Sequence, residues 1–147
     1  MLDPDDVVLD QLARHLPTTP LRVLYVGPAP AAAPERLRSL AQQLTTTFAP
    51  AAATGSYDLV CAHDDLLAMD DLRPAVVALC DAVGAGGVVS LLATAHRLEE
   101  VASYVAGRRM HVEAWYGVGA DGAPVGQRRD APLVHVVGRR AGVGGTA

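Results

Sequence analysis

Apolar residues along the chain fall into two patterns, one typical of strands and the other of helices. Short continuous apolar runs, bounded by turn residues, are typical of strands buried on both faces, and they occur at Leu21–Val26, Asp58–Ala62 and Val88–Ala93. Apolar residues that recur every three or four positions predict helices at 4–16, 35–44, 72–83 and 96–108.

Two stretches between these elements have weaker patterns. Residues 45–56, TTTFAPAAATGS, predict at most a short strand at Thr46–Phe48. The sequence GAGG at 84–87 predicts a turn between the third helix and the third clear strand.

The pattern changes near the C-terminus. Met110–Gly117 and Leu133–Gly138 alternate between apolar and polar residues, which predicts an antiparallel pair joined by a long polar loop. The whole order predicts an α/β, Rossmann-like fold: a mostly parallel sheet with helices on both faces and a C-terminal antiparallel hairpin. We expect one domain over residues 1–140, with an N-terminal helix within 1–17, and a flexible tail at 141–147.

Composition narrows the class of protein. The chain has 147 residues, of which 50% are apolar, so it can bury the core of one domain. A net charge of −4 and an aromatic content of 4% argue against nucleic-acid binding. No apolar stretch is long enough to span a membrane, and the acidic start MLDPDD is unlike a signal peptide, so a cytoplasmic protein is expected. Neither Cys61 nor Cys80 has metal-type spacing, and we expect no metal site.

Three stretches resemble class I S-adenosylmethionine-dependent methyltransferases. LRVLYVGP is similar to the family's first strand and cofactor loop. Residues 57–93, beginning YDLVCAHDD, resemble its fourth strand, following helix and fifth strand. LVHVVGRR resembles its last strand, so the resemblance covers about residues 20–140 and implies a reduced methyltransferase-like fold.

The cofactor loop departs from the family pattern. The resemblance implies an acidic residue two positions before the first of three spaced glycines, and Tyr25 stands there. Gly27 matches the first glycine, but Ala29 and Ala31 replace the next two. The prolines between these residues lack an amide donor, and the added methyl groups impede close approach of a ligand to the backbone. The family's acidic residue after its second strand also has no equivalent, since no Asp or Glu lies between Glu35 and Asp58.

The chain is also short between its first two clear strands. Residues 28–57 leave about a dozen positions beside one helix, too few for a second strand, a helix and a third strand. We therefore expect Leu21–Val26 to lie at or near a sheet edge, covered either by a short strand from 45–50 or by another chain. A protein partner follows as an expectation: a hetero-oligomer, or a homodimer through the first-strand edge.

Candidate site residues follow the strands, where ligands bind in open α/β sheets. His63 and His96 are candidate acid–base residues, with Asp64 orienting His63. Gly27 and Asp65 are the candidates for cofactor contacts. The candidates for binding an anionic substrate are Arg97, Arg128 and Arg129. For each, an ordinary structural role competes: a helix cap for the aspartates, a helix start for His96 and a solvated surface for the arginines.

Other polar residues have simpler expectations. His111 and His135 lie in the hairpin strands and are expected to be half-exposed. His15 ends the first helix, where a cation suits the negative helix end.

The functional prediction is a degenerate methyltransferase-like protein that has lost cofactor binding. It would act as a subunit or partner in a small-molecule biosynthetic step, such as a cofactor-independent cyclisation or elimination. A small active S-adenosylmethionine-dependent methyltransferase is the first alternative, with Gly27 and His63 near the donor. A non-enzymatic ligand-binding or regulatory domain is the second. A receiver-type domain fits poorly, because it needs acidic residues where Gly27 and Pro28 stand.

Overall fold

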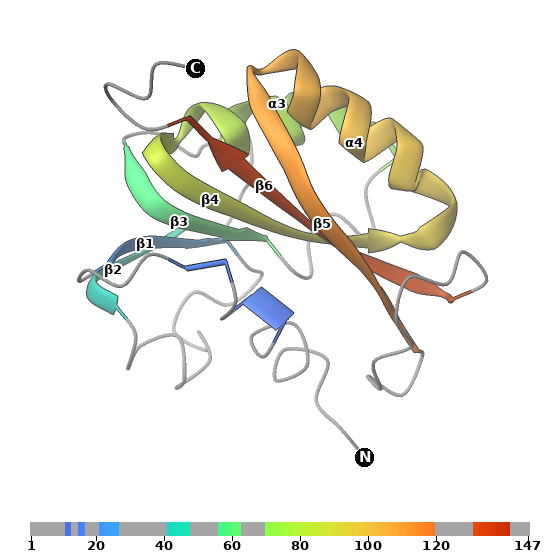
Figure 1. Ribbon diagram of the computed structural model, residues 1–147, viewed down its shortest axis with the longest axis horizontal. Coiled ribbons are helices and arrows are strands. Elements are labelled where there is room, and N and C mark those ends of the chain that lie inside the picture. The colour runs from blue at the N-terminus through green and yellow to red at the C-terminus, as the bar shows by residue number, and fades with distance from the viewer. Residues whose placement is uncertain are drawn as a thin grey trace.

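The computed structural model describes residues 11–12, 15–16, 21–26, 41–47, 56–62, 70–119 and 131–141. Within them, one six-stranded sheet has the order β2-β1-β3-β4-β6-β5 (Figure 1). The strands are β1 (Leu21–Val26), β2 (Ala41–Thr47), β3 (Tyr57–Ala62), β4 (Val83–Thr94), β5 (Met110–Val118) and β6 (Leu133–Arg140). The helical elements are α3 (Arg73–Asp81), the short 3₁₀ helix η4 (Ala95–Arg97) and α4 (Leu98–Gly107).

The sheet combines a parallel and an antiparallel part. β2, β1, β3 and β4 are parallel to one another, and β6 then pairs antiparallel with both β4 and β5. The strands expected at Leu21–Val26, Asp58–Ala62 and Val88–Ala93, the helices after residue 70 and the closing antiparallel pair are therefore confirmed. Of the N-terminal helix expected within residues 4–16, residues 4–10 and 13–14 lie outside the described residues, Gln11 and Leu12 are helical, and His15 and Leu16 form a turn and a bend.

The segment around residue 44 was predicted wrongly. Ala41–Leu44 was expected to end a helix, but it begins β2, which lies parallel to β1 with Val26 opposite Thr47. The run of threonines and the β-pairing with β1 outweigh the helical spacing of Leu40, Ala41 and Leu44. A second strand is thus present, contrary to the length argument, although none of the described residues forms a third strand outside it.

The presence of β2 also means that β1 does not lie at the edge of the sheet, where it was expected. β1 is hydrogen-bonded to β2 on one side and β3 on the other, so it is an interior strand. The alternative in which a nearby strand of the same chain covers β1 is confirmed. The first-strand edge cannot serve as a dimer surface, because its backbone groups are already paired.

The two faces of the sheet pack differently. α3 and α4 lie together on one face (Figure 1), where the core includes Val60, Val89, Leu91 and Val136. The opposite face carries a smaller cluster that includes Leu12 and Leu16 from the N-terminal segment. Its other apolar members are Val23, Tyr25, Leu59, Cys61, Val88, Val137 and Tyr116. Alternation along each strand assigns successive side chains to these two faces.

The GAGG sequence was expected to be a turn before the strand, but it lies inside β4. The pairing of Tyr57 with Val83 is followed by that of Leu59 with Val88, so β4 carries extra residues at this point. Gly86 has a φ of 75°, a conformation that glycine adopts without steric cost. The turn-like sequence thus forms an irregularity within one strand, which strongly bends and twists a sheet locally.

Gly87 is the position in this irregularity where a side chain would be most costly. A Cβ there would lie 2.9 Å from the carbonyl oxygens of Gly84 and Tyr57. We expect Gly87→Ala to lower the free energy of unfolding by about 1–3 kcal/mol, measured by urea denaturation. Gly107→Ala is the matched control, because a Cβ at Gly107 meets no atom within 4 Å. It should leave stability unchanged or raise it by up to about 1 kcal/mol, and an equal loss in both variants would contradict this interpretation.

Candidate functional site

The carboxyl ends of β1, β3 and β4 lie at Val26, Ala62 and Thr94, and this is the edge where the site was expected. Most of the expected residues lie outside the described part of the chain: Gly27, His63, Asp64, Asp65, Arg128 and Arg129. His96 and Arg97 are described, and both belong to η4, directly beyond β4.

Arg97 is held by an ion pair at this edge. Its Nε lies 2.9 Å from Oε1 of Glu100, and its Nη2 donates to the backbone carbonyl of Asp70 at 2.6 Å. Tyr104 donates its hydroxyl to the same Glu100 carboxylate at 3.0 Å. The hydrogen bond from Arg97 is the main cause of a lowered pKa for Glu100. A substrate anion would have to displace Glu100, whereas the neighbouring His96 is exposed.

Tyr25 is buried one residue before the end of β1. Its side chain is 4% exposed and belongs to the cluster with Leu12, Leu59 and Cys61. The position that the resemblance makes acidic is therefore filled by an aromatic residue of the core. At the end of the adjacent strand, the residue opposite Val26 is Thr47, followed by Phe48 and Ala49. Among the described residues, neither strand end supplies a carboxylate for a cofactor.

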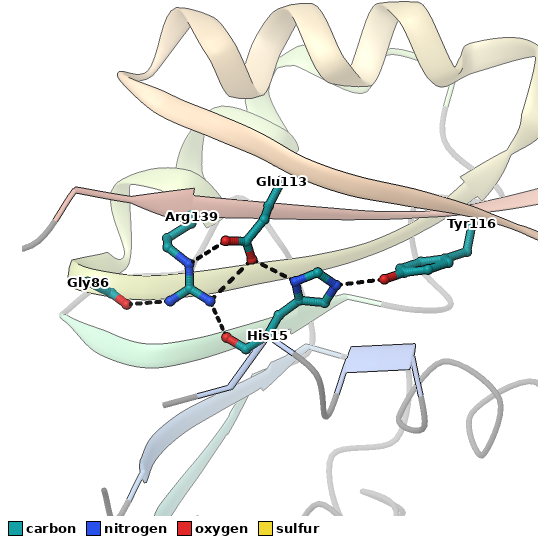
Figure 2. A network of polar contacts seen from close by, with 5 residues as sticks. All are labelled: His15, Gly86, Glu113, Tyr116 and Arg139. Carbon is teal, nitrogen blue, oxygen red and sulfur yellow. Dashed lines mark hydrogen bonds and ion pairs between the residues drawn. The ribbon is translucent and has the colours of Figure 1, made fainter. Parts of the chain in front are cut away.

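A second group of polar side chains lies on the face opposite α3 and α4, away from this edge (Figure 2). His15 lies between two residues of β5: its Nδ1 is 2.6 Å from Oε2 of Glu113, and its Nε2 is 2.7 Å from the hydroxyl of Tyr116. Arg139 of β6 donates from Nε to Oε1 of Glu113 at 2.9 Å. It also donates to the backbone carbonyls of His15 and Gly86.

A bulge in β5 places Glu113 in this network. Val112 pairs with Gly138 and Ala114 pairs with Val137, so Glu113 is the extra residue without a register partner in β6. Bulges commonly redirect a side chain in this way. The hydrogen bond from Arg139, with a smaller contribution from His15, lowers the pKa of Glu113 despite partial burial, which acts in the opposite direction. A carboxylate at this position is therefore stabilised in its charged form.

A third group lies deeper on the same face. Ser90 of β4 and His135 of β6 are both fully buried, and Ser90 Oγ lies 2.7 Å from Nε2 of His135. The other ring nitrogen, Nδ1, lies 2.9 Å from Oε1 of Gln11. One arrangement of protons satisfies both contacts: Nδ1–H donates to the Gln11 carbonyl oxygen, and the Ser90 hydroxyl donates to Nε2. His135 is neutral in this arrangement.

The order Ser90–His135–Gln11 resembles a nucleophile, a base and an orienting group, but its surroundings do not suit acyl transfer. β4 is paired on both sides, so the backbone N–H groups near Ser90 are committed to the sheet. Among the described residues, the amides of β4 around Ser90 are therefore not available to stabilise an oxyanion. Both side chains are also buried beneath the cluster that contains Leu12. The triad-like chain therefore positions the N-terminal residues against the sheet.

Tyr116 connects the two histidine groups. Its ring centroid lies 6.0 Å from that of His15 and 5.8 Å from that of His135.

The expectation of a half-exposed His135 is wrong, because His135 faces the cluster, whereas His111 is exposed. In the sequence, the buried hydrogen bond is signalled by a polar residue, Ser90, within the apolar run VVSLLA. The spacing of residues along the chain does not identify His135 as its partner.

The described residues hold no group of three or more His, Cys, Asp or Glu side chains that could bind a metal ion. In the same part of the chain, no helix is long and apolar enough to cross a membrane.

Comparison with known proteins gives similarity at the level of structure. No protein-family model matches the chain, and a search of curated sequences found no match. Among solved structures, the [4+2]-cyclase SpnF superposes with a TM-score of 0.66 at 12% identity, over 94% of this chain and 81% of SpnF. The N-methyltransferase NodS from Bradyrhizobium japonicum, in complex with S-adenosylhomocysteine, superposes with a TM-score of 0.65 at 14% identity, over 93% of this chain and 85% of NodS.

A further neighbour is a chain of the complex between the Haloferax volcanii Trm112 methyltransferase activator and its methyltransferase partner. It gives a TM-score of 0.64 at 11% identity, over 92% of this chain and 89% of that chain. At these identities the similarity shows a shared fold. The chain thus has the Rossmann-like fold of class I S-adenosylmethionine-dependent methyltransferases, as the sequence resemblance implied.

The buried hydrogen bond between Ser90 and His135 should contribute measurably to stability. Ser90→Ala leaves Nε2 of His135 without the hydroxyl in a fully buried position, and we expect a loss of about 1–3 kcal/mol in the free energy of unfolding. Ser103→Ala, at an exposed position of α4, is the matched control and should be neutral or slightly stabilising. Similar effects in the two variants would contradict the assigned role of Ser90.

The network around Glu113 predicts a specific pH dependence of stability. Because the folded pKa of Glu113 lies below the ordinary value of 4.5, its contribution is complete above that value. The contribution is lost as the pH falls through the folded pKa. The difference in urea stability between the wild type and Glu113→Gln should therefore be larger at about pH 7 than at about pH 3. A difference that is constant or grows in acid would contradict the lowered pKa.

Proposed function

We propose that this methyltransferase-fold chain has lost S-adenosylmethionine binding and acts, with a protein partner, in a small-molecule biosynthetic step. The observation that carries this proposal is the burial of Tyr25 in the core at the position where the resemblance implies an acidic residue. A core aromatic held by Leu12 and Cys61 cannot be exchanged for a ligand contact without opening the cluster.

The chemistry around the strand ends supports the same proposal. Gly27 is followed by Pro28-Ala29-Pro30-Ala31, which offers fewer amide donors and less room than a glycine loop. The family's acidic residue after its second strand, which holds the ribose hydroxyls, has no equivalent here, since no Asp or Glu lies between Glu35 and Asp58. The residues present therefore do not fit the cofactor, and no step of the proposed reaction proceeds through it.

A reaction without a cofactor is compatible with this fold. A fold supports different chemistries through different residues at one site, and the structural neighbour SpnF is a [4+2]-cyclase. We propose a cyclisation or elimination at the carboxyl edge, with His63 and His96 as acid–base residues and Asp64 orienting His63. Arg128 and Arg129 would bind an anionic part of the substrate, and Arg97 would join them where that anion displaces Glu100. The exposed position of His96, directly after β4, suits proton transfer to a bound molecule.

A partner chain would complete this site. A neighbour of the same fold assembles with the Trm112 activator, which supports heteromeric assembly as a use of the fold. The partner does not bind along β1, because both edges of that strand are paired within the chain.

The alternative is a small active methyltransferase, and the presence of β2 beside β1 favours it over the expectation from chain length. In that case Gly27 would approach the donor, and Gly27→Leu would abolish binding. Asp65 would then be a further candidate for a cofactor contact. A non-enzymatic ligand-binding role remains the second alternative, and it predicts a bound small molecule without turnover.

Calorimetric titration with S-adenosylmethionine and S-adenosylhomocysteine separates these functions. We expect no saturable binding to the folded protein at ligand concentrations up to about 1 mM, a limit that corresponds to about 4 kcal/mol of binding free energy. NodS, whose structure contains S-adenosylhomocysteine, is the positive control under the same conditions. Saturable binding in the micromolar range that is lost in Gly27→Leu would overturn the proposal and establish the methyltransferase alternative.

A further inference from the structure

The four described residues Gln11, Leu12, His15 and Leu16, here called the N-terminal strap, cover part of the sheet face opposite α3 and α4. Leu12 is fully buried in the cluster with Tyr25, Cys61 and Val137. Leu16 packs against the same cluster. The strap is therefore a lid over this face rather than a part of the sheet.

The contacts of the strap with the sheet differ in kind from those within the sheet. Each hydrogen bond described between the two involves a side chain: His15 with Glu113 and Tyr116, Arg139 with the His15 carbonyl, and Gln11 with His135. The one backbone hydrogen bond described for the strap, from His15 N to Leu12 O, is internal. Opening the strap would thus break side-chain contacts and leave every described strand pairing intact.

The anchoring residues also form a cooperative unit. Glu113 receives hydrogen bonds from Arg139 and His15, and Arg139 also holds the His15 backbone (Figure 2). Removing one member weakens the contacts of the others, because charge-assisted hydrogen bonds in one network depend on each other. Local opening with a free energy below that of global unfolding is common for segments held in this way.

We infer that the N-terminal strap is a latch that opens as a unit, released when the His15–Glu113–Arg139 contacts are lost, while the sheet stays folded. Opening uncovers a neutral, hydrogen-bonding surface on β4, β5 and β6, made by Ser90, His135 and Tyr116. The same movement uncovers Cys61, which lies in the cluster with Leu12. The inference does not depend on the loss of the cofactor.

The two cysteines provide a direct test, because neither is in a disulfide and they lie on opposite faces. Cys61 is buried in the cluster that includes Leu12 and Leu16 of the strap, whereas Cys80 is buried on the other face, with α3 and α4. Burial raises the pKa of the Cys80 thiol to about 12, so each thiol is compared with itself across variants and not with the other thiol. The rates of alkylation by N-ethylmaleimide, followed by mass spectrometry of the cysteine peptides, report the opening of each face.

We expect Glu113→Gln and His15→Ala to accelerate alkylation of Cys61 by about tenfold and to leave Cys80 at its wild-type rate. Asp81→Asn is the matched control, because it removes a carboxylate from the Arg108 ion pair, which joins α3 to the end of α4. That variant should leave Cys61 unchanged.

Equal acceleration of both cysteines in Glu113→Gln would show global unfolding in place of latch opening and would overturn the inference. An unchanged Cys61 rate would overturn it as well. If His15→Ala does not fold, Tyr116→Phe removes only the hydroxyl that contacts His15 Nε2. This milder variant should still accelerate Cys61 selectively, and a wild-type rate for Cys61 in both Tyr116→Phe and Glu113→Gln would count against the latch.

Discussion

The structure depends on the position of β4 between a parallel and an antiparallel neighbour. β3 pairs with it in parallel and β6 in antiparallel, so the strand joins the Rossmann-like half of the sheet to the closing hairpin. Its alternate side chains also supply both cores: Val89 and Leu91 pack with α3 and α4, whereas Val88 and Ser90 face the N-terminal strap. Features on opposite faces are therefore connected through one strand.

The sequence predicted the elements whose patterns are local and failed where pairing decided the outcome. Buried runs and helical spacing identified β1, β3 and the two helices α3 and α4, and alternation identified the hairpin. The strand at Ala41–Thr47 was predicted only as a short strand at Thr46–Phe48, because its first residues lack an apolar run and its conformation is set by the neighbouring β1. The GAGG sequence was wrongly predicted to be a turn before the strand, because it lies within β4 as an irregularity of the pairing with β3.

For the candidate site too, the sequence predicted the local features and not those that depend on tertiary contacts. The resemblance and the order of strands place His96 and Arg97 beyond β4, and they lie there. The ion pair of Arg97 with Glu100 and the contacts of His15 with Glu113 and Tyr116 were not foreseen. The first depends on local helix geometry, whereas the second joins residues about a hundred positions apart and follows from a bulge that no sequence pattern marks.

The chain has the fold of class I S-adenosylmethionine-dependent methyltransferases, and the two faces of its sheet hold different side-chain chemistry. Near the end of β1, Tyr25 is part of the core, and on the face beneath the strap a polar network holds Gln11 and His15. We propose that the protein keeps this fold without binding S-adenosylmethionine. Two-dimensional amide NMR spectra recorded with increasing S-adenosylhomocysteine test it most directly, because each residue of β1 and β3 reports separately. We predict unchanged resonances at Tyr25, Val26 and Ala62, and saturable shifts at those residues would contradict the account.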